Sequence, residues 1–198
     1  LKDYSLVIAG TEQYDSNLLS SLSKLKVISR LGVGTDNIDL KAANDNGIKV
    51  FKTKTTPANA VTELALGLII DLSREITKSC NDTKNHNWNK RMGTLLKGKT
   101  LGVIGLGVIG REFVKLVKGF EFNVLAFDKI EDDSFSTSNN ITYCSLENLL
   151  SNSDIVSIHL NLNDSTNKLI DRKKLELMKK DAILINTSRG EIIDEKAL

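Results

Sequence analysis

Three glycines at positions 105, 107 and 110 have the spacing GxGxxG, which lets a backbone turn approach a pyrophosphate group closely. In such a turn Gly105 permits the tight bend, Gly107 admits the phosphates, and Gly110 lets the following helix pack against the preceding strand. The N-terminus of that helix supplies free N–H groups and the positive end of its dipole. The spacing therefore predicts a dinucleotide-binding turn.

An aspartate follows the glycine motif at the distance typical of an acid that binds the adenosine ribose. Asp128 ends the apolar segment 123–127, eighteen residues beyond Gly110. Its carboxylate would accept hydrogen bonds from the ribose hydroxyls and repel a 2′-phosphate. Glu131 and Asp132 add negative charge, and Lys129 is the only nearby cation. We expect a site for NAD rather than NADP; a solvated acid at a strand end is the alternative interpretation.

Arg189 is the candidate for binding a substrate carboxylate. It follows the apolar segment 182–186, and a planar guanidinium can hold a carboxylate with two hydrogen bonds while it polarises a neighbouring carbonyl. A surface arginine at a strand end is the alternative. The chain has two histidines. We expect neither to transfer protons, because His86 lies in a polar segment and His159 ends a strand that lines the cofactor.

The overall composition argues against several functional classes. The chain has 198 residues, 40% of them hydrophobic, and a net charge of +2 with scattered basic residues, which does not favour nucleic-acid binding. The longest apolar run, 65–70, is too short to cross a bilayer. Cys80 and Cys144 fit no metal-binding spacing. We expect a cytoplasmic protein that binds no metal, nucleic acid or membrane.

Strands and helices alternate along the chain, which indicates parallel sheets with right-handed crossovers. In the first part, strands are predicted over 6–9, 26–29 and 48–51 and helices over 17–25 and 38–46. A long helix then begins at Thr56 and Pro57, and its apolar face is formed by residues 61, 64, 65, 68, 69 and 72. We expect a small α/β domain over 1–55 and a dinucleotide-binding domain over 56–198.

Strands of the second domain are predicted over 101–104, 123–127, 154–160 and 182–186, and a short helix over 145–150. Residues 81–89 and 131–140 are polar and are expected to form loops, and Gly119 is expected to end the helix after the glycine turn. This pattern is typical of a Rossmann-type doubly wound parallel sheet. Ligands bind such sheets beyond the carboxyl ends of the strands, so both His159 and Arg189 should border the cofactor.

Four segments resemble the D-isomer-specific 2-hydroxyacid dehydrogenases, with phosphoglycerate dehydrogenase as the most similar kind. They are residues 30–39 (RLGVGTDNID), 61–63 (VTE), 98–102 (GKTLG) and 186–198 (NTSRGEIIDEKAL). The resemblance implies a Rossmann NAD domain and a smaller, incomplete flavodoxin-like substrate domain. It also implies a homodimer that transfers a hydride between NAD and a D-2-hydroxy acid or 2-oxo acid.

The resemblance also implies roles for individual residues. Arg189 matches the arginine that orients the substrate carboxylate and keto oxygen, and Arg30, Val33 and Gly34 match positions at the substrate. The backbone amides of Val108 and Ile109 match those that bind the pyrophosphate. The cofactor-binding positions are Gly105, Gly107, Val108, Ile109, Gly110, Asp128, His159, Leu160, Thr187 and Ser188.

The chain departs from the family pattern in places. The family's Glu–His proton-transfer pair matches positions beyond Leu198, so we expect a chain that is truncated at both ends and inactive alone. No arginine stands near Ala9, where phosphoglycerate dehydrogenases would hold the substrate phosphate, which disfavours 3-phosphoglycerate. Two alternatives remain open: a non-catalytic NAD(H)-binding regulator similar to a corepressor, and an inactive fragment.

Overall fold

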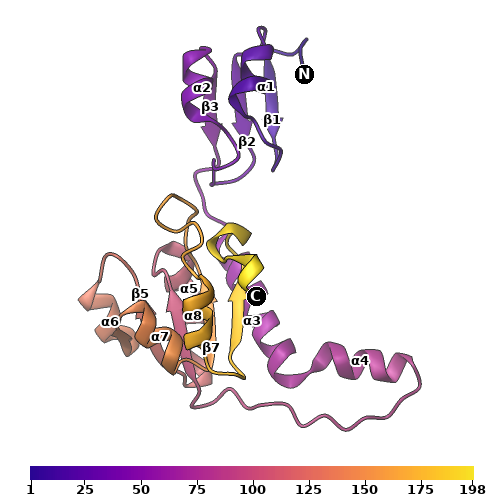
Figure 1. Cartoon of the computed structure of the whole chain (residues 1–198), viewed down its shortest axis with the longest axis vertical. Coiled ribbons are helices and arrows are strands. Elements are labelled where there is room, and N and C mark those ends of the chain that lie inside the picture. Colours follow the sequence, from indigo (N-terminus) through magenta and orange to yellow (C-terminus); the bar gives the residue numbers. More distant parts are fainter. The chain divides into compact units, whose positions relative to one another are not determined.

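The computed structural model describes residues 1–198, which divide into two compact units, Leu1–Thr56 (unit 1) and Pro57–Leu198 (unit 2) (Figure 1). Each unit contains its own parallel sheet, of three strands in unit 1 and five in unit 2. This division follows from the contacts within each unit and carries no information about function. The substrate-binding role expected of residues 1–55 stays a prediction.

Unit 1 is a three-stranded parallel sheet with two helices. Its elements are β1 (Leu6–Ala9), α1 (Ser16–Ser21), β2 (Val27–Arg30), α2 (Leu40–Asp45) and β3 (Lys49–Lys52). Because the strand order is β1-β2-β3, two right-handed crossovers place both helices on one face of the sheet. Leu19, Ile28 and Ala43 are buried in the core of this unit. Ile8 and Phe51 are exposed.

Aspartates fix where both helices of unit 1 begin. The Asp15 carboxylate accepts a hydrogen bond from the Leu18 amide (2.8 Å), and the Asp39 carboxylate accepts one from the Ala42 amide (2.9 Å). Each bond satisfies an amide that has no partner within its helix. Both helices are shorter than the sequence predicts, because only six residues of each continue the helical bonding.

The sheet of unit 2 has the Rossmann strand order. Its strands are β4 (Thr100–Ile104), β5 (Asn123–Phe127), β6 (Ile141–Tyr143), β7 (Ile155–Ile158) and β8 (Ile183–Asn186). They are all parallel and run in the order β6-β5-β4-β7-β8. The chain leaves β4 toward β5 on one side and β7 lies on the other, which creates a switch point at β4. The predicted fold class is confirmed.

Helices cover both faces of this sheet. They are α5 (Val108–Leu116), α6 (Asp133–Asn139), α7 (Leu146–Asn152) and α8 (Arg172–Leu177), with 3-10 turns η1 (Val117–Phe120), η2 (Gly190–Ile192) and η3 (Glu195–Ala197). Neighbouring residues of β4 point to opposite faces. Val103 packs with Phe113 in one core, and Ile104 packs with Leu149 in the other. The glycine turn after Ile104 is therefore held by a strand that is buried on both sides.

Two helical segments overlap predicted loops: the loop prediction for 131–140 is wrong, and that for 81–89 is wrong over 81–84 only. α6 occupies most of 131–140, where Asp132 caps the helix by accepting from the Phe135 amide (3.0 Å). α4 (Ile76–Lys84) occupies the start of 81–89. The helix after the glycine turn ends at Leu116 rather than at Gly119, because the chain tightens there into η1.

The long helix α3 (Ala58–Arg74) buries only part of the apolar face that the sequence predicts. Ala65 and Ile69 are buried, whereas Leu64 is 57% and Leu72 is 53% exposed. α3 packs against α5 and β8, and its buried residues are Ala58, Thr62, Ala65, Ile69 and Ser73. Its N-cap is Pro57 rather than Thr56, and no side chain caps it. From α3 the chain continues through α4 and returns in extended form toward β4 (Figure 1). No helix is long and apolar enough to traverse a lipid bilayer.

Candidate functional site: a dinucleotide-binding turn

The glycine turn connects β4 to α5, and each of its glycines meets a different requirement. Gly105 has φ +96°, and a Cβ there would lie 2.7 Å from the His159 carbonyl oxygen. A Cβ on Gly110 would lie 2.0 Å from the Gly105 carbonyl oxygen, so helix and turn approach too closely for any side chain. Gly107 has no atom within 4 Å of the Cβ position. Two glycines therefore serve packing, and the third faces open space.

Gly107 is also the N-cap of α5, and no side chain bonds to the first turn of this helix. Val108, the first helical residue, is 65% exposed. Open space in front of uncapped amides at the positive end of a helix dipole fits a pyrophosphate group. The turn thus has the shape and the donors that the dinucleotide requires.

Asp128 lies directly beside this turn. Its Oδ2 accepts a hydrogen bond from the Leu106 amide (2.6 Å), and its Oδ1 accepts one from the Ile130 amide (3.2 Å). A carboxylate has about four acceptor positions, so two remain for ribose hydroxyls. Asp128 thus connects the end of β5 to the glycine turn by a hydrogen bond, and its carboxylate can accept further hydrogen bonds there.

Arg111 is a residue of this site that our sequence analysis missed. Its Nε donates to the Leu106 carbonyl (2.9 Å), and its Nη1 lies 2.6 Å from the Asp132 carboxylate. The guanidinium also lies over the Phe135 ring, 4.8 Å from the ring centroid. An arginine immediately after the third glycine, in the first turn of α5, was the available signal in the sequence.

His159 follows β7 and is 8% exposed. Its Nε2 lies 3.0 Å from the Ser157 hydroxyl, and its ring lies 5.0 Å from Phe113 between centroids. Burial lowers the pKa of the imidazole from 6.5 to about 4, so the ring is neutral near pH 7. Its Nδ1 and the Thr187 hydroxyl are buried without a hydrogen-bond partner. These two polar atoms follow adjacent strands at the carboxyl edge of the sheet, where a ligand would be expected.

The loop after β8 is bonded to β7 and to itself. The Ser188 hydroxyl donates to the Ile158 carbonyl (2.9 Å), and the Asn186 side chain accepts from the Ser188 amide (3.0 Å) and donates to the Arg189 carbonyl (2.8 Å). Arg189 Nη1 donates to the Ser188 carbonyl (3.0 Å). Arg189 is therefore held at the same edge of the sheet as His159, Leu160 and the glycine turn.

The predicted substrate residues of unit 1 lie at the carboxyl end of β2. Arg30 is 8% exposed, and its guanidinium donates to the Asn37 side chain (3.3 Å) and contacts the Leu31 carbonyl. Val33 and Gly34 are half-buried in the loop that follows. The buried Arg30 side chain thus stabilises (braces) this loop through its contacts with Asn37 and the Leu31 carbonyl. The structure groups these three residues in unit 1 and the cofactor candidates with Arg189 in unit 2.

Glu12 also belongs to unit 1. Its carboxylate accepts a hydrogen bond from the Gly10 amide (2.8 Å), and its carbonyl accepts one from the Asn37 side chain (2.7 Å). A negative charge therefore stands in the loop after β1, next to the loop that Arg30 braces. No group of three or more His, Cys, Asp or Glu side chains is arranged to hold a metal ion.

Residues 66–198 match the family model described as the NAD binding domain of D-isomer specific 2-hydroxyacid dehydrogenase. The chain is 37% identical over 195 residues to hydroxypyruvate reductase of Thermotoga maritima, covering 98% of this chain and 63% of that protein. It is 37% identical to D-3-phosphoglycerate dehydrogenase of Methanocaldococcus jannaschii, covering 98% of this chain and 37% of that protein. The chain thus spans less than two thirds of these curated relatives.

A solved structure gives the same result. D-lactate dehydrogenase from Aquifex aeolicus, complexed with NAD and lactic acid, superposes with a TM-score of 0.90 at 30% sequence identity. The match covers all of this chain and 60% of that one. The glycine turn, the acid beside it and these similarities together show that the chain belongs to the D-isomer specific 2-hydroxyacid dehydrogenase family and contains its NAD-binding domain.

Proposed function

We propose that the protein is an NAD-dependent oxidoreductase that interconverts a D-2-hydroxy acid and the corresponding 2-oxo acid. The observation that carries this proposal is the grouping of the glycine turn, Asp128 and the Arg189 loop at one carboxyl edge of the sheet in unit 2. A site for a dinucleotide and a guanidinium for a carboxylate then lie where doubly wound sheets bind ligands.

Each candidate residue has a proposed task. The amides of Val108 and Ile109 bind the pyrophosphate at the start of α5, and Asp128 binds the ribose hydroxyls. The cofactor is lined by His159, Leu160, Thr187 and Ser188. NAD, when bound, accepts or donates the hydride. Arg189 holds the carboxylate and polarises the keto oxygen of the substrate, and Arg30, Val33 and Gly34 form the substrate side in unit 1.

We further propose that the substrate is a short acid without a phosphate group. The Glu12 carboxylate stands in the loop after β1, and a like charge there disfavours a phosphate. Arg30 is engaged by Asn37 and the Leu31 carbonyl. The curated relatives include proteins named hydroxypyruvate reductase and glyoxylate reductase, whose substrates fit this description.

The test measures NADH oxidation by the purified protein with glyoxylate and with hydroxypyruvate, and NAD reduction with D-lactate and with D-3-phosphoglycerate. NADH binding is measured in parallel by calorimetry. Turnover with an unphosphorylated acid supports the proposal, and a preference for D-3-phosphoglycerate contradicts the substrate class. NADH binding without turnover of any of the four acids does not support the proposed activity, and it fits either a non-catalytic, NAD(H)-binding regulator or an inactive fragment.

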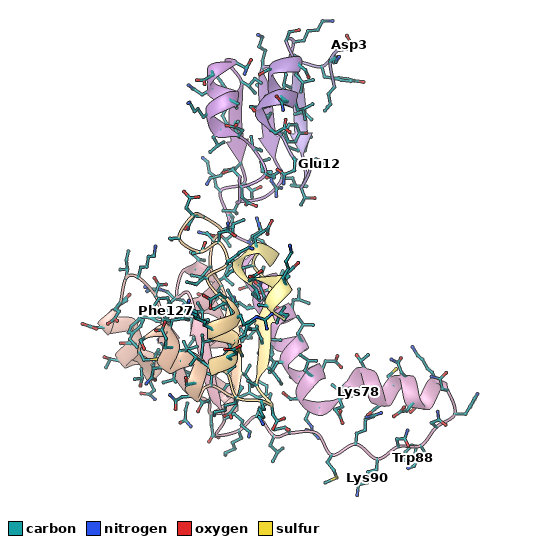
Figure 2. The ribbon with its side chains drawn as sticks, in the orientation of Figure 1. Asp3, Glu12, Lys78, Trp88, Lys90 and Phe127 are labelled. Atoms are coloured by element: carbon teal, nitrogen blue, oxygen red, sulfur yellow. The ribbon has the colours of Figure 1, made fainter.

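We also propose that the protein forms a homodimer through unit 2. α3 carries a stripe of exposed leucines at helical spacing, Leu64, Leu68 and Leu72. In the extended segment after α4, Trp88 is 92% and Met92 is 78% exposed. Figure 2 shows the Trp88 side chain on this segment. Several large apolar side chains exposed together indicate an interaction surface. The commonest assembly of identical subunits is a two-fold symmetric dimer.

Sedimentation velocity tests the dimer. The double substitution Leu64→Lys and Leu72→Lys should shift the protein from dimer to monomer, because both positive charges would face a buried surface. Lys180→Glu, an exposed residue outside the stripe, is the control. A monomer in the unsubstituted protein would contradict the proposal.

We propose a cytoplasmic location. Cys80 and Cys144 are both free thiols, which fits a reducing compartment. Cell fractionation with an antibody against the protein tests this location, and recovery in a membrane or secreted fraction would contradict it.

A further inference from the structure

Arg111 and Asp128 contact opposite sides of the same residue. The Leu106 amide donates to Asp128 Oδ2 (2.6 Å), and the Leu106 carbonyl accepts from Arg111 Nε (2.9 Å). The amide nitrogen and carbonyl oxygen of one residue are at most about 4 Å apart, given standard backbone dimensions. The guanidinium therefore lies within side-chain reach of the ribose end of the predicted cofactor site.

Asp132 holds this guanidinium in place. Its Oδ2 lies 2.6 Å from Arg111 Nη1, while its Oδ1 accepts from the Phe135 amide (3.0 Å) and the Ser134 hydroxyl (2.9 Å). These hydrogen bonds, that of Phe135 foremost and then that of Arg111, lower the pKa of Asp132 to about 2. Asp132 is thus charged at every physiological pH and neutralises Arg111.

This pair bears on cofactor choice, because an arginine near the ribose is what accommodates the 2′-phosphate of NADP in dinucleotide-binding folds. The Arg111 and Asp132 side chains are 35% and 30% exposed, so a ligand could reach both. The other cation in this region, Lys129, donates to the Ser165 hydroxyl (2.7 Å). Arg111 and Asp128 are linked by hydrogen bonds to the same residue, Leu106.

We propose that Asp132 is a specificity-determining residue that favours NAD over NADP by keeping Arg111 paired and unable to bind a 2′-phosphate. Two carboxylates then act against NADP in different ways. Asp128 repels the phosphate directly, and Asp132 occupies the Arg111 guanidinium, which could otherwise compensate. The inference rests on the NAD-binding domain and not on the proposed substrate or turnover.

The alternative is that Arg111 and Asp132 form an ordinary ion pair that fastens α5 to α6. Such partly exposed pairs contribute little to stability, and removing one would affect NADH and NADPH alike. The two interpretations therefore differ in one measurable quantity, the ratio of the dissociation constants for NADPH and NADH.

The experiment measures these two constants by calorimetry at one fixed salt concentration for the unsubstituted protein and for Asp132→Asn. Asparagine retains the cap of α6, because its side-chain oxygen can still accept from the Phe135 amide. We expect NADPH to bind about tenfold more tightly, the size of one charge-assisted hydrogen bond, while NADH binding changes by less than about threefold. The ratio of the dissociation constants for adenosine 2′-monophosphate and adenosine 5′-monophosphate should shift in the same direction. These two nucleotides report on the ribose end of the site alone.

A second substitution identifies Arg111 as the cause. In the double variant Asp132→Asn and Arg111→Gln, the gain for NADPH should disappear while NADH binding persists. A gain that survives Arg111→Gln, or equal changes for both dinucleotides in Asp132→Asn, would overturn the proposal. If Asp132→Asn loses NADH binding as well, Asp132→Ser replaces it, since serine also caps helices. No NADPH gain in either variant overturns the proposal.

Discussion

The two sheets of this molecule are built from the same repeating strand and helix, yet helices cover one face of the first and both faces of the second. In unit 1 the strand order β1-β2-β3 sends both crossovers in the same direction, and Ile8 and Phe51 remain exposed. In unit 2 the order reverses at β4, so that helices pack on both faces. Handedness of the crossovers and strand order therefore decide which sheet is fully covered.

The same reversal of strand order at β4 creates the candidate cofactor site. The connection after β4 leads to β5 on one side, and the connection after β7 leads to β8 on the other. Between these two connections, the carboxyl ends of β4 and β7 are not covered by a crossover helix. The glycine turn, the His159 segment and the Arg189 loop all follow strands at this edge. Unit 1 has no such reversal, and its candidate residues form a braced loop after β2.

The largest effect that we expect comes from the closest backbone contact in unit 2. Gly110→Ala would place a Cβ 2.0 Å from the Gly105 carbonyl, and overpacking against backbone should destabilise unit 2 by about 3 kcal/mol and abolish NADH binding. Gly119→Ala, with no atom within 4 Å of its Cβ, is the matched control and should change stability by less than about 1 kcal/mol. Urea unfolding and calorimetry measure both, and equal effects would refute the packing argument.

Arg189→Ala should lower turnover of the 2-oxo acid by about 10² to 10⁴-fold, because a bidentate, polarising contact to the substrate is lost. NADH affinity should change by less than about threefold, since the loop after β8 is held by Ser188 and Asn186. Steady-state kinetics and NADH titration on the same preparation separate these effects. Unchanged turnover would remove Arg189 from the proposed mechanism.

His159 should make the stability of unit 2 depend on pH in a way that unit 1, which has no histidine, does not share. The imidazole pKa is about 4 in the folded protein and about 6.5 when unfolded. Between these values the unfolded chain binds a proton that the folded chain does not. Stability is therefore retained above pH 6.5 and falls by about 3 kcal/mol as the pH drops to 4.

Urea unfolding at a series of pH values checks this window. His159→Asn, which removes the titrating group, is the matched variant and should unfold with a smaller pH slope between 6.5 and 4 whatever its absolute stability. An identical slope in both proteins would show that other groups titrate on unfolding.

The smallest effect should come from the uncovered face of unit 1. Ile8→Thr replaces a side chain that is 71% exposed and keeps the β-branch, so stability should change by less than about 0.5 kcal/mol. Ile28→Ala, at a fully buried position on the neighbouring strand, should cost about 2 to 5 kcal/mol. A large loss for Ile8→Thr would show that this face is covered in the assembled protein.

Much of the glycine turn could be predicted from the sequence because its requirements are local. Gly105 needs a positive φ, and the spacing to Gly110 follows from the entry into α5. Asp128 was predictable for a similar reason, since it ends a strand that the pattern of apolar residues defines. The helix α6 was not predictable, because its residues are polar and only Phe135 packs against the core.

The face that α3 buries shows the limit most clearly. The apolar face predicted by periodicity includes the leucines at 64, 68 and 72 together with Ala65 and Ile69. The structure buries Ala65 and Ile69, because α3 packs closely against α5 and leaves Leu64 and Leu72 outside. Which part of this face becomes core depends on the neighbouring helix, and hydrophobic periodicity contains no information about that neighbour.

By itself the sequence determined the strand–helix alternation, the glycine turn and the acid beside it, because each depends on backbone conformation or on spacing along a single segment. Only the tertiary structure decided that Arg111 pairs with Asp132, 21 residues away, and that His159 is buried and neutral. Both depend on β5 and β7 lying on either side of β4. The pairing of strands brings distant residues together, and their burial then sets their charge.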